Sequence, residues 1–90
     1  MKFRHKGLRR FYDSDDTRGL NAVYAKRIRR VLTALQDARE PRNLDLPGLH
    51  LHPLTGDRHG QWSVRISGNW RIVFRFECGE AVDVDLIDYH

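Results

Sequence analysis

The sequence predicts an α+β domain in which two N-terminal helices pack on a small, mainly antiparallel sheet of three or four strands. Two observations predict this fold class. Apolar residues recur at helical spacing over the first 40 residues, and they alternate with polar residues after residue 61. Gly-containing turns separate the alternating runs, as in an antiparallel meander. A chain of 90 residues can bury one modest core, so we expect residues 1–90 to form a single domain.

The N-terminal elements are predicted to be a short edge strand at residues 2–4 and a brief helix after it. The helix would bury Leu8, Phe11 and Tyr12, which are spaced i, i+3, i+4. An aspartate-rich segment at residues 13–16 would end the helix and form a loop.

A longer helix is predicted over residues 21–38, and Pro41 prevents it from continuing far beyond Glu40. One face carries apolar residues at helical spacing: Leu20, Tyr24, Ile28, Val31 and Leu35, widened by Val23, Leu32 and Ala38. The opposite face carries four cations: Lys26, Arg27, Arg29 and Arg30. A connector at residues 40–61 contains all three prolines and is expected to be extended, with turns.

The register of the first hairpin follows from keeping one face of the sheet apolar. A two-residue turn at Gly68-Asn69 would mix polar and apolar residues on both faces. A three-residue turn at residues 67–69 instead pairs Ile66 with Trp70, Val64 with Ile72 and Trp62 with Phe74. The apolar face is then continuous, so we expect this register.

The same register places Arg65 directly opposite Arg71 on the polar face. Like charges in that position destabilise a sheet. A bound phosphate would explain the pair, because guanidinium groups match phosphate geometry. The alternatives are two solvated arginines that lean apart, or partial neutralisation by Asp85.

For the second hairpin, the same reasoning favours a three-residue turn at residues 78–80. Phe76 would then pair with Val82, and Phe74 with Val84. On the polar face Arg75 would meet Asp83 and form an ordinary cross-strand ion pair.

Composition and charge bound the class of protein. The single cysteine, Cys78, excludes an internal disulfide framework and fits a reducing cytosol. We expect no signal peptide and no membrane span, and therefore a cytoplasmic protein. Residues 1–50 carry a net charge of +6 and residues 51–90 a net charge of −2. The basic half suggests a polyanion or an acidic partner, although a solvated helix face is the commoner origin of such a bias.

Two of the five histidines, His52 and His90, lie next to turns or ends where an exposed imidazole can react. His50 and His52 could share a metal ion, but the sequence offers no second ligand pair at zinc-site spacing. We therefore expect no metal site. Together with Arg65, Arg71 and the terminal Asp-Tyr-His, these histidines favour acid–base chemistry on a phosphodiester.

The segments "HPLTGDRHGQWSVRISGNWRIVFRF" and "DVDLIDYH" resemble the toxins of HigB-type toxin–antitoxin modules in the RelE/ParE superfamily. The resemblance extends to the "FRHKGLRRFY" start and the basic helix, and its most specific parts are the arginine-bearing hairpin and the "DYH" ending. It implies a ribosome-dependent endoribonuclease that cleaves translated mRNA without a metal or another cofactor. It also implies a helix-turn-helix antitoxin of the HigA type, and contact with the ribosome through its 16S rRNA.

The resemblance also implies roles for individual residues. The catalytic set would be His52, Arg65, Arg71, Asp88, Tyr89 and His90. The RNA-binding set would be Lys26, Arg27, Arg29, Arg30 and Arg58. One position departs from some relatives, which carry lysine where this chain has Thr55. Two other functions stay open: gyrase inhibition, as in the ParE branch, and RNA binding without cleavage.

Overall fold

The computed structural model describes residues 1–88. Two α-helices and three short 3-10 helices occur there: α1 (Lys6–Ser14), η1 (Ala22–Tyr24), α2 (Ala25–Asp37), η2 (Pro41–Leu44) and η3 (Gly56–Arg58). The strands are β1 (His52–Pro53), β2 (Trp62–Arg65), β3 (Trp70–Glu77) and β4 (Glu80–Asp88). None of these helices is long and apolar enough to cross a membrane.

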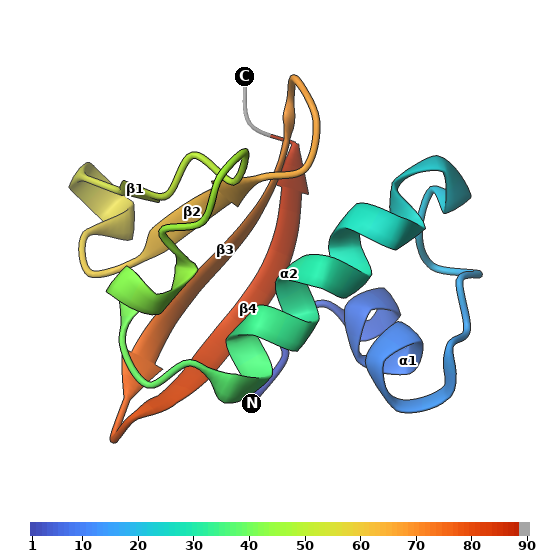
Figure 1. The fold of residues 1–90 in the computed structure, drawn as a ribbon, viewed down its shortest axis with the longest axis horizontal. Helices are drawn as coiled ribbons and strands as arrows, with labels where there is room; N and C mark the ends of the chain where they lie inside the picture. The colour runs from blue at the N-terminus through green and yellow to red at the C-terminus, as the bar shows by residue number, and fades with distance from the viewer. Residues whose placement is uncertain (89–90) are drawn as a thin grey trace.

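The four strands form one sheet in the order β1-β2-β3-β4, and each neighbouring pair is antiparallel. The helix α2 lies across one face of the sheet, and α1 lies beside α2 near β4 (Figure 1). The predicted fold class is therefore confirmed. The connector contributes one strand that periodicity did not reveal, because β1 has only two residues.

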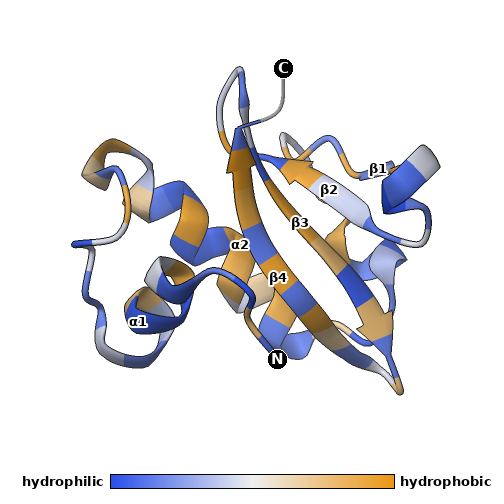
Figure 2. Cartoon of the chain, turned by 180° about the vertical axis from the view of Figure 1, so that it is seen from behind, coloured by the Kyte–Doolittle hydropathy of each residue, from blue (hydrophilic) through white to orange (hydrophobic). Residues whose placement is uncertain are grey.

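The core forms between α2 and the apolar face of the sheet. Hydrophobic and hydrophilic residues alternate along β3 and β4, as Figure 2 shows, so only one face can bury apolar side chains. The buried cluster includes Ile28, Val31 and Leu35 from α2. Ile72 and Phe74 from β3 belong to the same cluster.

The predicted register of the first hairpin is confirmed. Val64 pairs with Ile72, and Arg65 pairs with Arg71. The N–H of Ile66 donates to the carbonyl of Trp70 at 2.9 Å, which closes the three-residue turn.

The predicted register of the second hairpin is wrong near its turn. Glu77 pairs with Glu80, so the loop has two residues, Cys78 and Gly79, with φ of 53° and 75°. Positive φ at both positions gives the turn whose twist matches that of the strands. The register then shifts by one residue between Val73 and Arg75.

A β-bulge at Asp83 produces this shift, since Asp83 has a φ of 52° and is the extra residue of β4. Beyond the bulge, towards the end of β4, Val73 pairs with Asp85, as the predicted register requires. The ion pair expected between Arg75 and Asp83 is confirmed, with Nε 2.7 Å from Oδ2.

The predicted long helix begins later than expected. Residues 22–24 form η1, which Asn21 caps by accepting from the N–H of Val23 at 3.1 Å. A 3-10 turn has three residues per turn, which rotates Val23 away from the α-helical stripe. Val23 is 81% exposed, so its predicted place on the apolar face is wrong.

The first residues do not form the predicted edge strand. Phe3 instead makes a single parallel bridge to Val84, because α1 begins only three residues later, after the His5 cap. Tyr12 was expected to be buried but is 37% exposed, and its ring packs 5.4 Å from the ring of Phe3.

We predict that Gly7→Ala destabilises the protein by about 1–3 kcal/mol, because a Cβ would lie 2.8 Å from the carbonyl oxygen of Gly19. Alanine is otherwise the better helix former, so a loss would report this backbone contact. Urea unfolding measures the effect. Gly68→Ala, where no atom lies within 4 Å of the added Cβ, is the matched control. Equal stability of Gly7→Ala and wild type would contradict the packing described here.

Candidate active site

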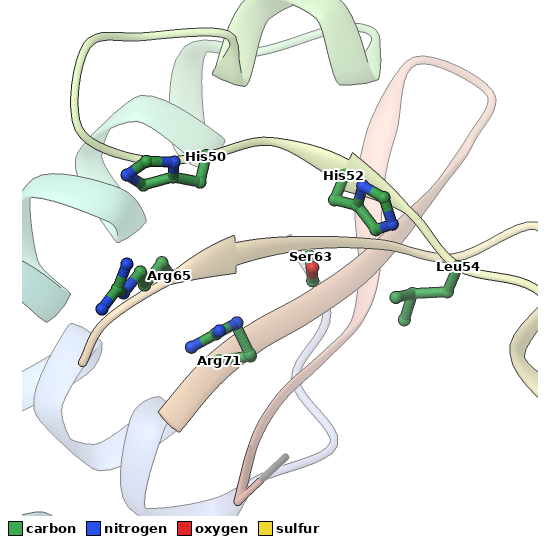
Figure 3. A pocket seen from close by; sticks show the side chains of 6 residues that line it. All are labelled: His50, His52, Leu54, Ser63, Arg65 and Arg71. Atoms are coloured by element: carbon green, nitrogen blue, oxygen red, sulfur yellow. The ribbon is translucent and has the colours of Figure 1, made fainter. Parts of the chain in front are cut away.

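A pocket of about 300 Å³ opens on the sheet face that α2 does not cover. Figure 3 shows the six side chains that line it: His50, His52, Leu54, Ser63, Arg65 and Arg71. They come from three successive segments of the chain, namely the connector, β2 and β3.

The register of the sheet explains why these residues meet. His52 pairs with Ser63 on β2, and Arg65 pairs with Arg71 on β3. Paired residues lie on the same face, and residues two apart on a strand also share a face. His52, Ser63, Arg65 and Arg71 are therefore placed on one face by the same pairing that builds the core on the other.

The pocket is cationic, since the described residues that line it supply two guanidinium groups, two imidazoles and no carboxylate. Among residues 1–88, neither Arg65 nor Arg71 forms an ion pair, and Asp85 does not supply one. The guanidinium of Arg71 donates instead to backbone carbonyls, the nearest being that of Ser67 at 2.7 Å.

The next arginine on β3 shows the contrast. Arg75 donates to Asp83 and Glu77, and these hydrogen bonds raise the pKa of its guanidinium above the usual value. The positive charge of Arg65 and Arg71 is left without such compensation within the described part of the chain. An anion in the pocket would provide it, and phosphate suits paired guanidinium groups.

The sequence predicted three of the six pocket residues, His52, Arg65 and Arg71. His50 and Ser63 were not predicted as site residues. Ser63 looked like a solvated strand residue, yet it is only 5% exposed. His50 has a φ of 51°, which interrupts the extended run before β1. Its position two residues before His52 was the one sequence signal available.

Comparison with known proteins supports this interpretation of the fold. The family described as "RelE-like toxin of type II toxin-antitoxin system HigB" matches residues 1–90. The chain belongs to this family. It is 41% identical over 88 residues to the Endoribonuclease HigB of Proteus vulgaris. The aligned residues cover 98% of this chain and 96% of that protein.

A solved structure, the YoeB/ParE toxin from Agrobacterium tumefaciens, matches this HigB-family toxin with a TM-score of 0.57 and 21% identity. The match covers 100% of this chain and 99% of that one, and it shows a shared fold. The predicted resemblance to HigB-type toxins is confirmed. As the toxin of a type II toxin–antitoxin system, the protein has an antitoxin as a partner.

The predicted RNA-binding residues of the toxin differ in whether their side-chain donors already bond to the protein itself. Arg27 donates to the carbonyls of Gly48 and Arg65, and Arg30 donates to that of Pro47 at 3.1 Å.

Of the remaining three predicted RNA-binding residues, Lys26 and Arg29 are exposed and Arg58 is half-buried. Arg29 pairs with Asp15 at 2.7 Å and lies over the ring of Phe11. Lys26 lines a shallow basic depression on α2 together with these arginines. Arg58 lies in η3 and donates to Gln61 at 3.0 Å.

The predicted C-terminal catalytic residues are placed only in part. Asp88 is the last residue of β4 and pairs with Trp70, next to Arg71. Alternation gives Asp88 and Arg71 opposite faces of the sheet at this edge. Tyr89 and His90 lie outside the described residues.

We predict that Arg65→Thr raises the free energy of unfolding by about 0.2–1 kcal/mol, because it removes a like-charge pair and adds a residue that favours strands. Urea unfolding at low ionic strength measures this effect. Arg75→Thr removes the same charge from the same face but also breaks two ion pairs, so it should lower stability. A destabilised Arg65→Thr would show that Arg65 is compensated in the free protein.

Proposed function

We propose that this toxin is an endoribonuclease that cleaves mRNA on translating ribosomes in the cytoplasm. The observation that carries the proposal is the cationic pocket, in which His52 lies on the same face as Arg65 and Arg71. The name of the Proteus vulgaris relative, an endoribonuclease, supports the same activity.

The proposed chemistry uses the 2′-OH of the RNA as the nucleophile. A base removes its proton, the oxygen attacks the adjacent phosphorus, and an acid protonates the 5′-oxygen as it leaves. The products are a 2′,3′-cyclic phosphate and a 5′-hydroxyl. Negative charge develops on the phosphoryl oxygens, so cations fixed next to them stabilise the transition state.

Arg65 and Arg71 are the proposed ligands of the scissile phosphate. The two arginines occupy paired positions on β2 and β3. Because the pairing holds both backbones in place, the two guanidinium groups move little during the reaction. His52 and His90 are the proposed acid and base, in an order that the proposal leaves open. The sequence left Asp88 two roles, to orient a histidine or to act as the base, and its place on the face opposite Arg71 favours the first. Tyr89 would stack on a base or donate to the phosphate.

The basic helix face would bind ribosomal RNA through phosphate contacts and give an affinity that falls with salt. Of the four cations on α2, Lys26 and Arg29 are the two that make no hydrogen bond to the carbonyls of residues 47–65. Arg58 would add a contact from η3. Some relatives carry lysine where this chain has Thr55, so Arg58, Arg65 or Arg71 would supply the corresponding charge.

The antitoxin would be a helix-turn-helix protein of the HigA type. The ribosome, through its 16S rRNA, and mRNA would be the other partners.

We predict that His52→Ala and His90→Ala each reduce cleavage by about 100-fold or more, because each removes a proton-transfer group. Mapping mRNA ends on translating ribosomes measures the cleavage. Binding to ribosomes should stay near the wild-type level in both variants.

His59→Ala, an imidazole outside the pocket, is the control and should cleave like wild type. End patterns identical to wild type in both His52→Ala and His90→Ala would reject the mechanism. Absence of cleavage by the wild type, with inhibited plasmid supercoiling, would indicate a gyrase inhibitor instead.

A further inference from the structure

His50 lies in the pocket but has no part in the chemistry proposed above. Its φ of 51° falls in the left-handed region, which residues other than glycine seldom adopt. Such a conformation persists where surrounding contacts hold it, and it is often found in functional sites. The contacts of the segment at residues 47–50, which we call the His50 loop, are therefore informative.

Three hydrogen bonds tie the His50 loop to α2 and β2. The N–H of Arg65 donates to the carbonyl of Leu49 at 2.7 Å. Arg30 donates to the carbonyl of Pro47 at 3.1 Å, and Arg27 donates to that of Gly48.

Arg27 has a second partner that links this loop to the site. Its Nε donates to the carbonyl of Arg65 at 3.1 Å. One guanidinium therefore holds both the His50 loop and the strand end that carries Arg65. An arginine side chain can donate to both carbonyls from different nitrogens of one rigid plane, which fixes their relative positions.

The imidazole of His50 lies at the same end of the pocket as the guanidinium groups of Arg65 and Arg71, whereas His52 lies farther along β1 (Figure 3). We propose that His50 binds a second RNA phosphate, adjacent to the scissile one, and that Arg27 is the positioning residue that holds it there. This inference rests on the proposed ribonuclease function.

The spacing of the site supports a second phosphate. His52 pairs with Ser63, while the loop next to His50 bonds to Arg65. The points on β2 that contact His52 and the residue before His50 are thus one two-residue step apart, about 6.6 Å along the strand. Consecutive phosphates of an extended RNA strand are separated by a similar distance.

The chemistry of the lining favours phosphate over a base as the ligand of His50. An imidazole N–H donates to a phosphoryl oxygen in either protonation state. Within residues 1–88 the pocket lining offers cations and no carboxylate that would repel a second phosphate.

Single-turnover cleavage of mRNA on programmed ribosomes tests the role of His50. His50→Ala should raise the toxin concentration for half-maximal rate about tenfold, because a charge-assisted hydrogen bond is lost. The rate at saturation should stay within about twofold of wild type. The slope of log affinity against log salt should become shallower, by up to about one unit.

Two further variants separate phosphate binding from base stacking. His50→Lys keeps a hydrogen-bond donor and supplies a positive charge, so it should restore the half-maximal concentration and the salt slope. His50→Phe keeps a ring alone and should behave like His50→Ala. Rescue by phenylalanine and not by lysine would overturn the phosphate assignment.

The failures of the two proposals are distinguishable. If wild type does not cleave mRNA on ribosomes, the proposed function is wrong. If wild type cleaves and His50→Ala matches it at every concentration, only the role of His50 is wrong. A large loss of the saturating rate in His50→Ala would also overturn a binding role.

The positioning role of Arg27 is tested by a double-mutant cycle. Arg27→Ala should raise the half-maximal concentration in the wild-type background and add little in the His50→Ala background. Lys26→Ala, which removes the same charge one residue earlier on α2, is the control and should be additive with His50→Ala. Additive effects of Arg27→Ala would show that Arg27 contacts RNA independently of His50.

Discussion

The pairing of β2 with β3 is the constraint on which the other features of this toxin depend. Val64 pairs with Ile72 on the face toward α2, and Arg65 pairs with Arg71 on the opposite face. A slip of one residue would exchange the two faces and place guanidinium groups in the core. Burial of apolar side chains therefore holds two like charges together, although their own interaction is unfavourable.

The distribution of charge partners distinguishes the pocket from the rest of the sheet. On β3, Arg75 is paired with two carboxylates, whereas Arg71, four residues earlier on the same face, donates to carbonyls. Cations around a concave surface that no carboxylate of residues 1–88 neutralises attract a polyanion and favour its binding. The family of toxins to which the chain belongs, and the endoribonuclease among its relatives, fit such a surface.

The helix α2 contributes to the site from the far face of the sheet. Its apolar side packs in the core. From the same helix, Arg27 donates hydrogen bonds to the carbonyls of Gly48 and Arg65. A residue that looks like a surface cation in the sequence is thus part of the framework. Packing of the helix and placement of the pocket are coupled through this one side chain.

The sequence by itself determined the fold class and the first hairpin, because period-two alternation leaves one register that keeps a face apolar. It also placed Arg65 and Arg71 on one face through that register, and it identified His52 through the family resemblance. Only the tertiary structure decided the bulge at Asp83 and the place of His50. The left-handed backbone at His50 and the bridge made by Arg27 depend on contacts between residues far apart in the chain. Local sequence patterns therefore do not predict them.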